Sequence, residues 1–385
     1  MNKSTERFLT THCGSMPRPS DLLDIMKLKF NGEPYDHGAY TGRLHSAVAE
    51  TVSRQVECGI DIPSDGEQGK AAFHTYMSER LVGFEGRPGA NMTEFADEQA
   101  AFPEYYEEYF ARAMAGGAVA PVVPMACTGP ITYIGQEALQ RDIDNLKSAV
   151  RGLKHEEVFM PAVAPSGVGT NEYYPSEEEY MFAVAEALSN EYQGIVDAGF
   201  ILQIDDPFLS KVYSDSSLGA SEKRKRGEIH VESVNHGLRG IPPEKVRYHT
   251  CYGINEGPRV HDAALKDVFE VMINVKAGAF SFEAANGRHE HEYKIFKDLK
   301  LAEGTVLVPG VIPHSSNIVE HPELIAERIL RYANLVGREQ VIAGADCGFS
   351  TMATYSTEVH PTVVWAKFQA MAQGARLATQ QLWGN

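Results

Sequence analysis

The chain has 385 residues, of which 43% are apolar and 23% are charged, and its formal net charge at pH 7 is −17. This length and composition are typical of a globular protein with one large α/β barrel or two ordinary domains. The negative charge argues against a nucleic-acid-binding protein, because such a protein needs a basic surface to neutralise phosphates.

Short apolar or β-branched runs alternate along the chain with longer amphipathic stretches. This alternation is typical of βα units that build a parallel sheet. The predicted strands are, in chain order, Phe8–His12, Gly59–Pro63, Val122–Cys127, Val158–Val163, Phe200–Asp205, Val246–Cys251, Ala279–Glu283, Val306–Val311 and Val341–Asp346. The intervening patterns include predicted helices over Glu177–Ala198, Asp262–Lys276 and His321–Val336.

Nine predicted strands are one more than a (β/α)8 TIM barrel requires, and we take Val122–Cys127 as the surplus one. No change of composition divides the chain, so we predict a single barrel domain over residues 1–385. An open doubly wound sheet is the alternative. Residues Phe84–Tyr109, rich in Gly, Glu and aromatic side chains, indicate a flap inserted over one face.

Five dispersed cysteines are too few for a disulfide framework and favour a reducing compartment. The segment Met1–Arg7 has no apolar run of a secretory signal, and no stretch approaches the roughly 18 apolar residues of a membrane span. We therefore expect a cytoplasmic protein with no membrane contact. The sequence leaves open whether the chain forms a homo-oligomer.

Several predicted strands end in a polar residue, and in TIM barrels the chemistry lies at these carboxyl ends. His249 and Cys251 are two residues apart, so on a strand both side chains point to one face. Imidazole and thiolate are ligands that zinc prefers, and Glu283 and Cys347 close neighbouring strands. The alternative is that both cysteines are small core residues and His249 is a core histidine. For Cys13 we expect core filling.

Other strand ends carry groups suited to a small substrate. Glu67 and Asp205 could hold an ammonium or a hydroxyl group, or could instead cap a helix or turn. After the first strand, Ser15 could present its backbone N–H to a ligand and Arg18 could bind an anion, although a plain turn explains both.

Two histidine patterns remain. His314 follows a strand and could donate a proton near neutral pH, or could be an exposed loop histidine. The segment from His289 to His291 looks like a metal tract, but we interpret it as a solvated segment at the rim, since a helix would scatter these side chains.

Taken together, these residues resemble the catalytic barrel of the cobalamin-independent methionine synthase family. The matching segments follow the family's order and cover most of the chain. They are Gly14–Pro19, Asp65–Glu67, Gln203–Pro207, His249–Tyr252, Phe282–Glu283, Pro309–Val311 with His314–Ser315, and Asp346–Gly348. A still closer likeness is to a short subgroup that includes epoxyalkane:coenzyme M transferases, through Thr5–Phe8, Phe282–His289, Asn317–Leu324 and Val364–Lys367.

The resemblance implies particular roles for the residues at these strand ends. It implies a zinc ion with His249, Cys251, Glu283 and Cys347 as ligands. It also implies an amino-acid thiol near Ser15, Glu67 and Asp205, and it matches His314 to a proposed proton donor.

The chain also departs from the family's pattern. Asp206 stands where the family usually has Glu, and Ala164–Gly167 stands where a tryptophan is expected. Many members carry a second barrel that helps to bind a polyglutamyl folate, and 385 residues leave no room for it. These departures concern the alkyl donor more than the thiol.

The resemblance therefore predicts a zinc-dependent S-alkyltransferase that acts on a small thiol and a small alkyl donor. The family's default is methyl transfer from a methyl-folate to homocysteine, which gives methionine. The alternatives are an epoxide-opening transferase of the coenzyme M type, a corrinoid-dependent methyltransferase, and a non-catalytic protein with a structural zinc ion.

Overall fold

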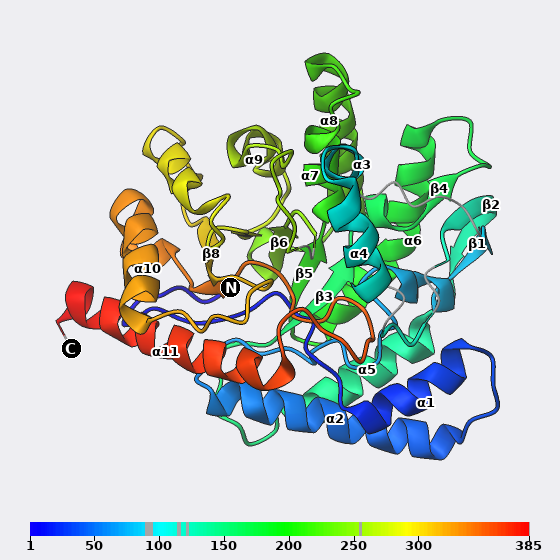
Figure 1. Cartoon of the computed structure of the whole chain (residues 1–385), viewed down its shortest axis with the longest axis horizontal. Coiled ribbons are helices and arrows are strands. Elements are labelled where there is room, and N and C mark those ends of the chain that lie inside the picture. Colours follow the sequence, from blue (N-terminus) through cyan, green and yellow to red (C-terminus); the bar gives the residue numbers. More distant parts are fainter. Residues whose placement is uncertain (89–94, 114–116, 121–122, 254–255, 385) are drawn as a thin grey trace.

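A curled parallel sheet forms the centre of the computed structural model, which describes residues 1–88, 95–113, 117–120, 123–253 and 256–384. Six strands follow one another in the order β3-β5-β6-β7-β8-β9, and helices surround them (Figure 1). Their bounds are β3 Phe159–Val163, β5 Ile201–Asp205, β6 Val246–Thr250, β7 Ala279–Phe282, β8 Val306–Ile312 and β9 Gly344–Ala345. Every residue of β3, β5, β6, β7 and β8 is buried, as expected for a sheet covered on both faces.

Two further segments close the sheet into a barrel. A parallel bridge joins Thr10 to Ala343 beside β9, and the next joins Thr11 to Ile62. The backbone N–H of Phe159, at the start of β3, then donates a hydrogen bond of 3.1 Å to the carbonyl of Pro63, which completes the ring. The predicted (β/α)8 TIM barrel is confirmed, and the open doubly wound sheet is wrong. The segments 8–12 and 59–63 contribute single bridges instead of regular strands.

The last barrel strand is shorter than predicted. Instead of spanning Val341–Asp346, regular pairing is confined to Gly344–Ala345. Asp346 turns its carboxylate to accept the backbone N–H groups of Ala284 and Ala285, at 2.7 and 2.8 Å. This pairing draws the end of β9 toward the segment after β7 and so fixes where Cys347 emerges.

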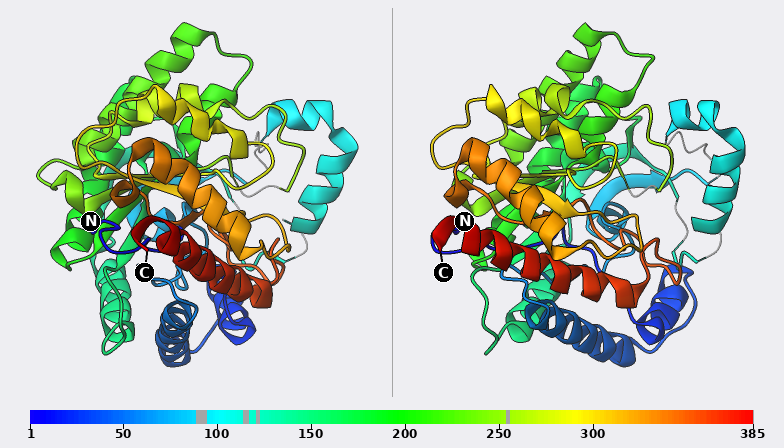
Figure 2. Two further views of the ribbon diagram at one scale, coloured as in Figure 1. Left: turned by 90° about the vertical axis from the view of Figure 1, so that its left-hand side faces the viewer. Right: turned by 60° about the vertical axis from the view of Figure 1, so that its left-hand side comes forward.

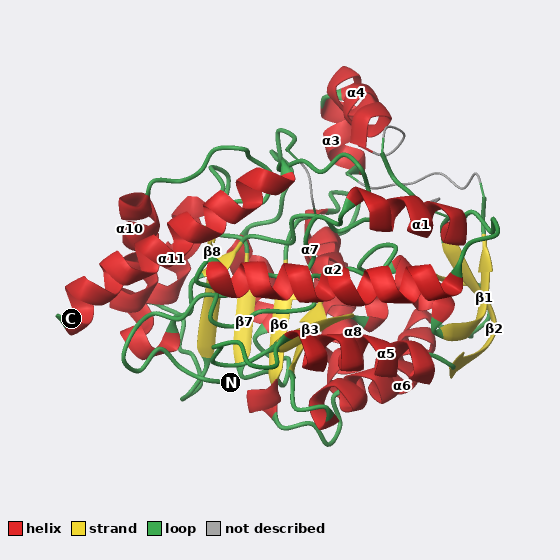
Figure 3. Cartoon of the chain, turned by 90° about the horizontal axis from the view of Figure 1, so that it is seen from below, coloured by secondary structure: helices red, strands yellow, loops and turns green. Residues whose placement is uncertain are grey.

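The predicted surplus strand belongs to a separate small sheet. This sheet consists of β1 (Leu81–Gly86), β2 (Met125–Tyr133) and β4 (Thr170–Asn171), with β2 between the other two. It lies away from β6, β7 and β8 (Figure 3). The predicted range 122–127 overlaps only the first residues of β2, and Val122 is outside the described residues.

Several of the helices that cover the barrel begin at a side-chain cap. The covering helices are α1 Ser20–Phe30, α2 His37–Glu57, α5 Gln136–Ala149, α6 Glu177–Asp197, α7 Pro207–Ser214, α8 Ala220–Gly237, α9 Leu265–Met272, α10 Pro322–Val336 and α11 Pro361–Trp383. Ser176, for example, accepts the N–H of Glu179 and starts α6. Helix α9 starts later than predicted because the carboxylate of Asp262 pairs with Arg259 and His289 instead of capping a helix.

The segment predicted as a flap, 84–109, contains the end of β1, α3 (Ala96–Ala101) and most of α4 (Pro103–Ala113), while residues 89–94 are outside the described part. The two helices stand off from the barrel wall (Figure 2). Asp97 of α3 accepts hydrogen bonds from Ser216, and Tyr109 of α4 donates one to Glu358. In the described part of the chain, no helix combines the length and apolarity needed to cross a membrane.

Candidate metal centre

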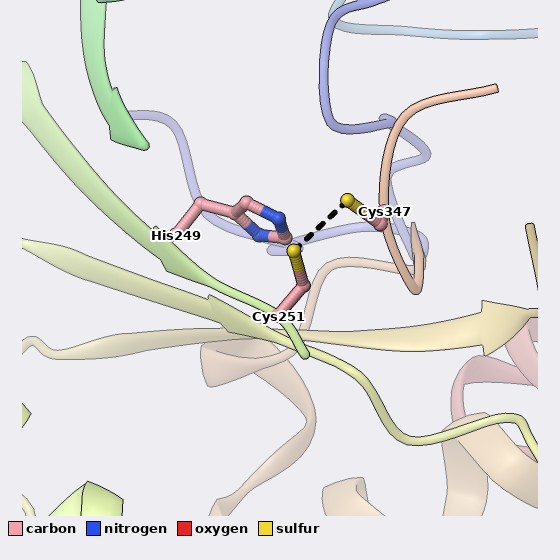
Figure 4. Close-up of side chains that lie close together, drawn as sticks. All are labelled: His249, Cys251 and Cys347. Atoms are coloured by element: carbon pink, nitrogen blue, oxygen red, sulfur yellow. Dashed lines mark hydrogen bonds between the residues drawn. The ribbon is translucent and has the colours of Figure 1, made fainter. Parts of the chain in front are cut away.

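Three soft or borderline donors converge at the carboxyl end of the barrel. His249 and Cys251 come from the end of β6, and Cys347 follows β9 (Figure 4). One donor atom from each lies within 4.8 Å of the other two. The Sγ atoms of Cys251 and Cys347 are 3.0 Å apart. All three residues are buried. His249 and Cys251 point to the same face, as expected for two residues that are two positions apart at the end of a strand.

One ring nitrogen of His249 has a hydrogen-bond partner, and the other has none among the described residues. Its Nδ1 lies 3.0 Å from the Oγ of Ser281, whereas Nε2 is buried and has no hydrogen-bond partner among the described residues. Burial lowers the pKa of His249 to about 3, so the ring is neutral at pH 7. A neutral imidazole with a buried, unpaired nitrogen fits a metal ligand, because leaving a buried polar atom unpaired costs about 1–3 kcal/mol.

The two thiols lead to the same interpretation. A hydrogen bond to Cys251, together with burial, raises the pKa of Cys347 well above its ordinary value. Without a nearby cation, Cys347 therefore keeps its proton. A divalent ion would supply the missing positive charge, and a donor set of one imidazole and two thiolates suits zinc.

Glu283, the fourth ligand that the resemblance implies, has other partners. Its Oε1 accepts the backbone N–H of Tyr252 at 2.8 Å, and its Oε2 lies 2.8 Å from Nη1 of Arg259. Burial is the largest single influence and acts to raise the pKa of Glu283, but the charge of Arg259, together with its hydrogen bond and the neighbouring histidines, outweighs burial and lowers the pKa to about 2. Its carboxylate lies close to His314 and Asp346 and forms a second cluster with them, separate from the three converging donors.

His314 is buried, not exposed in a loop. Both of its ring nitrogens lack hydrogen-bond partners in the described structure, and burial lowers its pKa to about 4. The ring is therefore neutral at pH 7. It lies beside Glu283 and Asp346 and does not line the cavity described next.

A cavity of about 60 Å³ adjoins the three converging donors. Its lining brings together the predicted residues Ser15, Glu67 and Asp205 with the donors themselves. The remaining lining residues are Cys13, Phe73, Pro207, Gly253, Gly348 and Thr351. A Cβ at Gly348 would lie 2.0 Å from the Oγ of Ser15, so a larger residue there would displace the Ser15 hydroxyl.

The charged side chains that line the cavity in the described structure are both carboxylates, Glu67 and Asp205. Glu67 adopts a φ of 54°, a conformation that favours glycine, and its Oε1 accepts from Nζ of Lys70 at 2.8 Å. Burial, and then the charge of Glu67, raise the pKa of Asp205 well above its ordinary value. The two carboxylates therefore share one neighbouring cation, Lys70, and a second positive charge would be needed to balance both in their ionised form.

Arg18 has a different position from the one predicted. It is buried behind the cavity, and its Nη2 donates to the backbone carbonyls of Glu67 and Lys70, at 2.8 and 2.9 Å. Its Nη1 donates to the carbonyl of Ser350 at 3.0 Å. With these donors taken by backbone, Arg18 fixes two loops of the rim and is not directed at an anion in the cavity.

Cys13 and His289 also differ from expectation. Cys13 is buried, as expected for a core residue, but it lines the cavity and its Sγ lies 3.6 Å from Nδ1 of His249. Its place directly after the first strand is a signal that could have identified it. The interpretation of His289 as solvated is wrong, because it is buried between Asp262 and Glu292, at 3.0 and 2.7 Å. Both of its nitrogens are therefore used.

Comparison with known proteins identifies relatives along the whole chain. The family model of the cobalamin-independent synthase catalytic domain matches residues 170–367. The methionine synthase of Thermococcus kodakarensis is 24% identical over 379 residues, which cover 97% of this chain and 94% of the relative. That of Sulfolobus acidocaldarius is 24% identical over 348 residues, or 89% and 86% of the two chains.

A solved structure agrees with the barrel. The B12-independent methionine synthase of Shewanella sp. W3-18-1, in complex with selenomethionine, superposes with a TM-score of 0.74 at 18% identity. The match covers 98% of this chain and 100% of that one. At this identity the likeness supports the fold.

Proposed function

The chain belongs to the cobalamin-independent methionine synthase family and is a methyltransferase of that kind; we propose that it transfers a methyl group from a methyl-folate to homocysteine and forms methionine. The observation that carries this proposal is the convergence of His249, Cys251 and Cys347 on one cavity that is also lined by two carboxylates. The Thermococcus relative, named a methionine synthase, is matched over 94% of its length, which supports this activity in a chain of similar size.

Zinc is the metal we propose, with His249, Cys251 and Cys347 as the residues that would hold it. The unpaired Nε2 of His249 and the two adjacent thiols support this assignment. When bound, zinc keeps a coordinated thiol in its thiolate form at neutral pH, whereas a free thiol with a pKa of about 8.5 is only a few per cent ionised.

Glu67 and Asp205 select the thiol through charge. An ammonium group between them would provide the positive charge that this wall lacks, and it would stabilise Asp205 in its ionised form. Homocysteine carries such an ammonium group. Coenzyme M carries a sulfonate instead, which would meet two carboxylates, so the cavity favours the amino-acid thiol over the epoxide-opening alternative.

The reaction needs a sulfur nucleophile, a methyl carbon and a proton for the leaving nitrogen. The S–C bond forms as the C–N bond of the methyl-folate breaks, and the nitrogen then takes up a proton. His314 is the residue we propose to relay that proton. Its neutral ring lies beside Glu283 and Asp346, and both of its nitrogens are unpaired among the described residues, so it can take up a proton at one nitrogen and then pass it to the leaving nitrogen. The surrounding burial excludes water from the sulfur.

A structural zinc protein is the alternative from a different class. Structural zinc sites are closed by four protein ligands, whereas three donors converge here next to a cavity. The comparisons give no support to this alternative or to the corrinoid-dependent one.

Turnover with paired thiols and methyl or alkyl donors tests the proposal. Homocysteine and coenzyme M would each be combined with a methyl-folate, methylcobalamin and a short epoxide, and the products identified by mass spectrometry. We expect methionine from homocysteine and the methyl-folate. Faster alkylation of coenzyme M by the epoxide, or methionine formed only from methylcobalamin, would contradict the proposed donor and thiol.

A further inference from the structure

Lys70 is a buried cation that contacts one of the cavity carboxylates but does not itself line the cavity. Its Nζ donates to Oε1 of Glu67 and to the backbone carbonyl of Pro161 in β3, both at 2.8 Å. The same atom lies 4.2 Å from the centre of the Tyr76 ring. Each of the three ammonium donors of Lys70 thus faces an acceptor, so none is left for an anionic group of a substrate.

The aromatic ring next to Lys70 is fixed at its far end by a buried carboxylate. The hydroxyl of Tyr76 donates to Oε1 of Glu191, a buried residue of α6, at 2.7 Å. The other oxygen of Glu191 accepts from the hydroxyl of Tyr133 at 2.9 Å and pairs with Arg80 at 2.7 Å. The ring position is therefore set by α6, and the ammonium of Lys70 is held in one place.

Lys70 is charged although it is buried. Burial is the largest single influence and lowers its pKa, but the charges of Glu67 and Asp65, with the hydrogen bond to Glu67, outweigh burial and raise the pKa above its ordinary value. Burial, and then Glu67, raise the pKa of Asp205, whereas the charge of Lys70 acts in the opposite direction. The ion pair thus brings one positive charge to the two cavity carboxylates.

The two carboxylate oxygens of Glu67 have different surroundings. Oε1 accepts from Lys70, whereas Oε2 accepts no hydrogen bond from the described residues, and Glu67 lines the cavity. The backbone of Glu67, with its φ of 54°, is held separately, because Asp65 accepts its N–H at 3.0 Å and Arg18 donates to its carbonyl at 2.8 Å. The contribution of Lys70 is therefore the direction of the carboxylate.

We propose that Lys70 is a positioning residue for the choice of thiol: it holds Oε1 of Glu67, so that Oε2 is presented to the ammonium group of an amino-acid thiol. This inference rests on the proposed function. An uncharged side chain at position 70 would leave the carboxylate of Glu67 free to turn, and the ammonium group would lose one of its two acceptors. The ammonium group takes no part in the bonds that form and break, so the effect should appear in binding and not in kcat.

The affinities of two thiols for the zinc-loaded protein, measured by calorimetry, test this role. The first is homocysteine, and the second is 4-mercaptobutyrate, which is homocysteine without its amino group. We expect Lys70→Met to raise the Kd of homocysteine about tenfold and to leave that of 4-mercaptobutyrate unchanged, with kcat for homocysteine within about threefold of the parent. Equal changes for both thiols, or an unchanged Kd for homocysteine, would overturn the proposal.

A double variant tests the role even if Lys70→Met does not fold. Lys70→Met combined with Glu67→Gln removes both members of the buried pair and leaves no uncompensated charge. Because Lys70 acts through Glu67, we expect the Kd of homocysteine to equal that of Glu67→Gln alone. A further rise of about threefold or more would contradict the proposed role. Lys29→Met is the control and should change no Kd, since Lys29 pairs with Glu79 and does not line the cavity.

The outcomes also separate this inference from the proposed function. A parent protein that forms no methionine from homocysteine and a methyl-folate contradicts the proposed function itself. A parent that forms methionine, but whose Lys70→Met variant keeps the parent's Kd for homocysteine, contradicts only the role given to Lys70.

Discussion

Two neighbouring groups of buried polar side chains at the carboxyl end of the barrel differ in how their charges and donors are matched. In the first group, His249 has an unpaired Nε2, and the thiols of Cys251 and Cys347 have each other as neighbours. In the second group, Arg259 faces Glu283 and Asp262, and a histidine, His289, lies between Asp262 and Glu292.

The difference distinguishes polar groups that are available to bind a ligand, which are those of the first group, from polar groups that stabilise the surrounding loops, which are those of the second. An unmatched buried donor is costly, so it persists where a ligand supplies the partner. A group in which each carboxylate already faces a cation gains little from a metal ion. The comparison indicates that the first group would hold the proposed metal ion, whereas the second group connects loop segments around it.

Removing one donor of the first group should produce the largest effect. Structural zinc sites bind with about 10–16 kcal/mol shared among four ligands, so one thiolate contributes about 4 kcal/mol, or roughly 1000-fold in affinity. We therefore expect Cys347→Ser to weaken zinc binding by about that factor and to abolish methionine formation. Chelator competition measures the change.

Cys58→Ser provides the matched control for this prediction. Cys58 is also a buried free thiol, but it ends α2 and does not line the cavity. It should leave zinc affinity unchanged. Equal losses in both variants would mean that general destabilisation, not loss of a ligand, explains the result.

The second group predicts a dependence of stability on pH. Hydrogen bonds to Asp262 and Glu292, and the charges of Glu283 and Glu292, outweigh burial and raise the pKa of His289 to about 9 from an ordinary value near 6.5. Between these values the folded state binds the extra proton, so stability falls as pH rises. We expect about 3 kcal/mol of the unfolding free energy, present below pH 6.5, to be lost as pH rises through 9.

Urea unfolding of the parent and of His289→Gln, at several pH values between 6 and 10, measures this loss. The variant should lack most of the pH dependence in that range, although Arg259 remains nearby. The exposed His291, substituted by Gln, is the control and should behave as the parent does. A slope that persists unchanged in His289→Gln would show that this histidine is not charged in the folded protein.

The smallest of the three effects concerns the carboxylates that line the cavity next to the first group. Replacing Asp205 by Asn removes one of two carboxylates that would hold the ammonium of homocysteine, and a charged hydrogen bond is worth about 2 kcal/mol. We expect KM for homocysteine to rise about 30-fold, with zinc content unchanged. Alkylation of 3-mercaptopropionate, which has no ammonium group, should not decline. Equal losses with both thiols would remove the ammonium assignment.

The barrel and the convergence of three donors could be predicted because both depend on local pattern. Alternation with a period of two placed His249 and Cys251 on one face, and polar residues at strand ends indicated which edge of the sheet carries the site. The same rule, applied to Cys13 after the first strand, would have identified it as a cavity residue.

The second group could not be predicted, because its contacts join loops with no periodic pattern. Nothing in the spacing of Arg259 from Glu283 indicates an ion pair, and the alternation of His and Glu after residue 288 suggests a solvated segment. Arg18 follows a Gly/Ser turn that suggests an anion site, whereas its guanidinium donates to backbone carbonyls. These contacts depend on how the loops fold over the barrel end.

Zinc K-edge X-ray absorption of the purified protein, with and without homocysteine, tests the central claim most directly. We expect two sulfur atoms at about 2.3 Å in the free protein, from Cys251 and Cys347, and three when homocysteine is present. A protein that neither contains nor takes up zinc, or a sulfur shell that stays at two with homocysteine, would contradict the account.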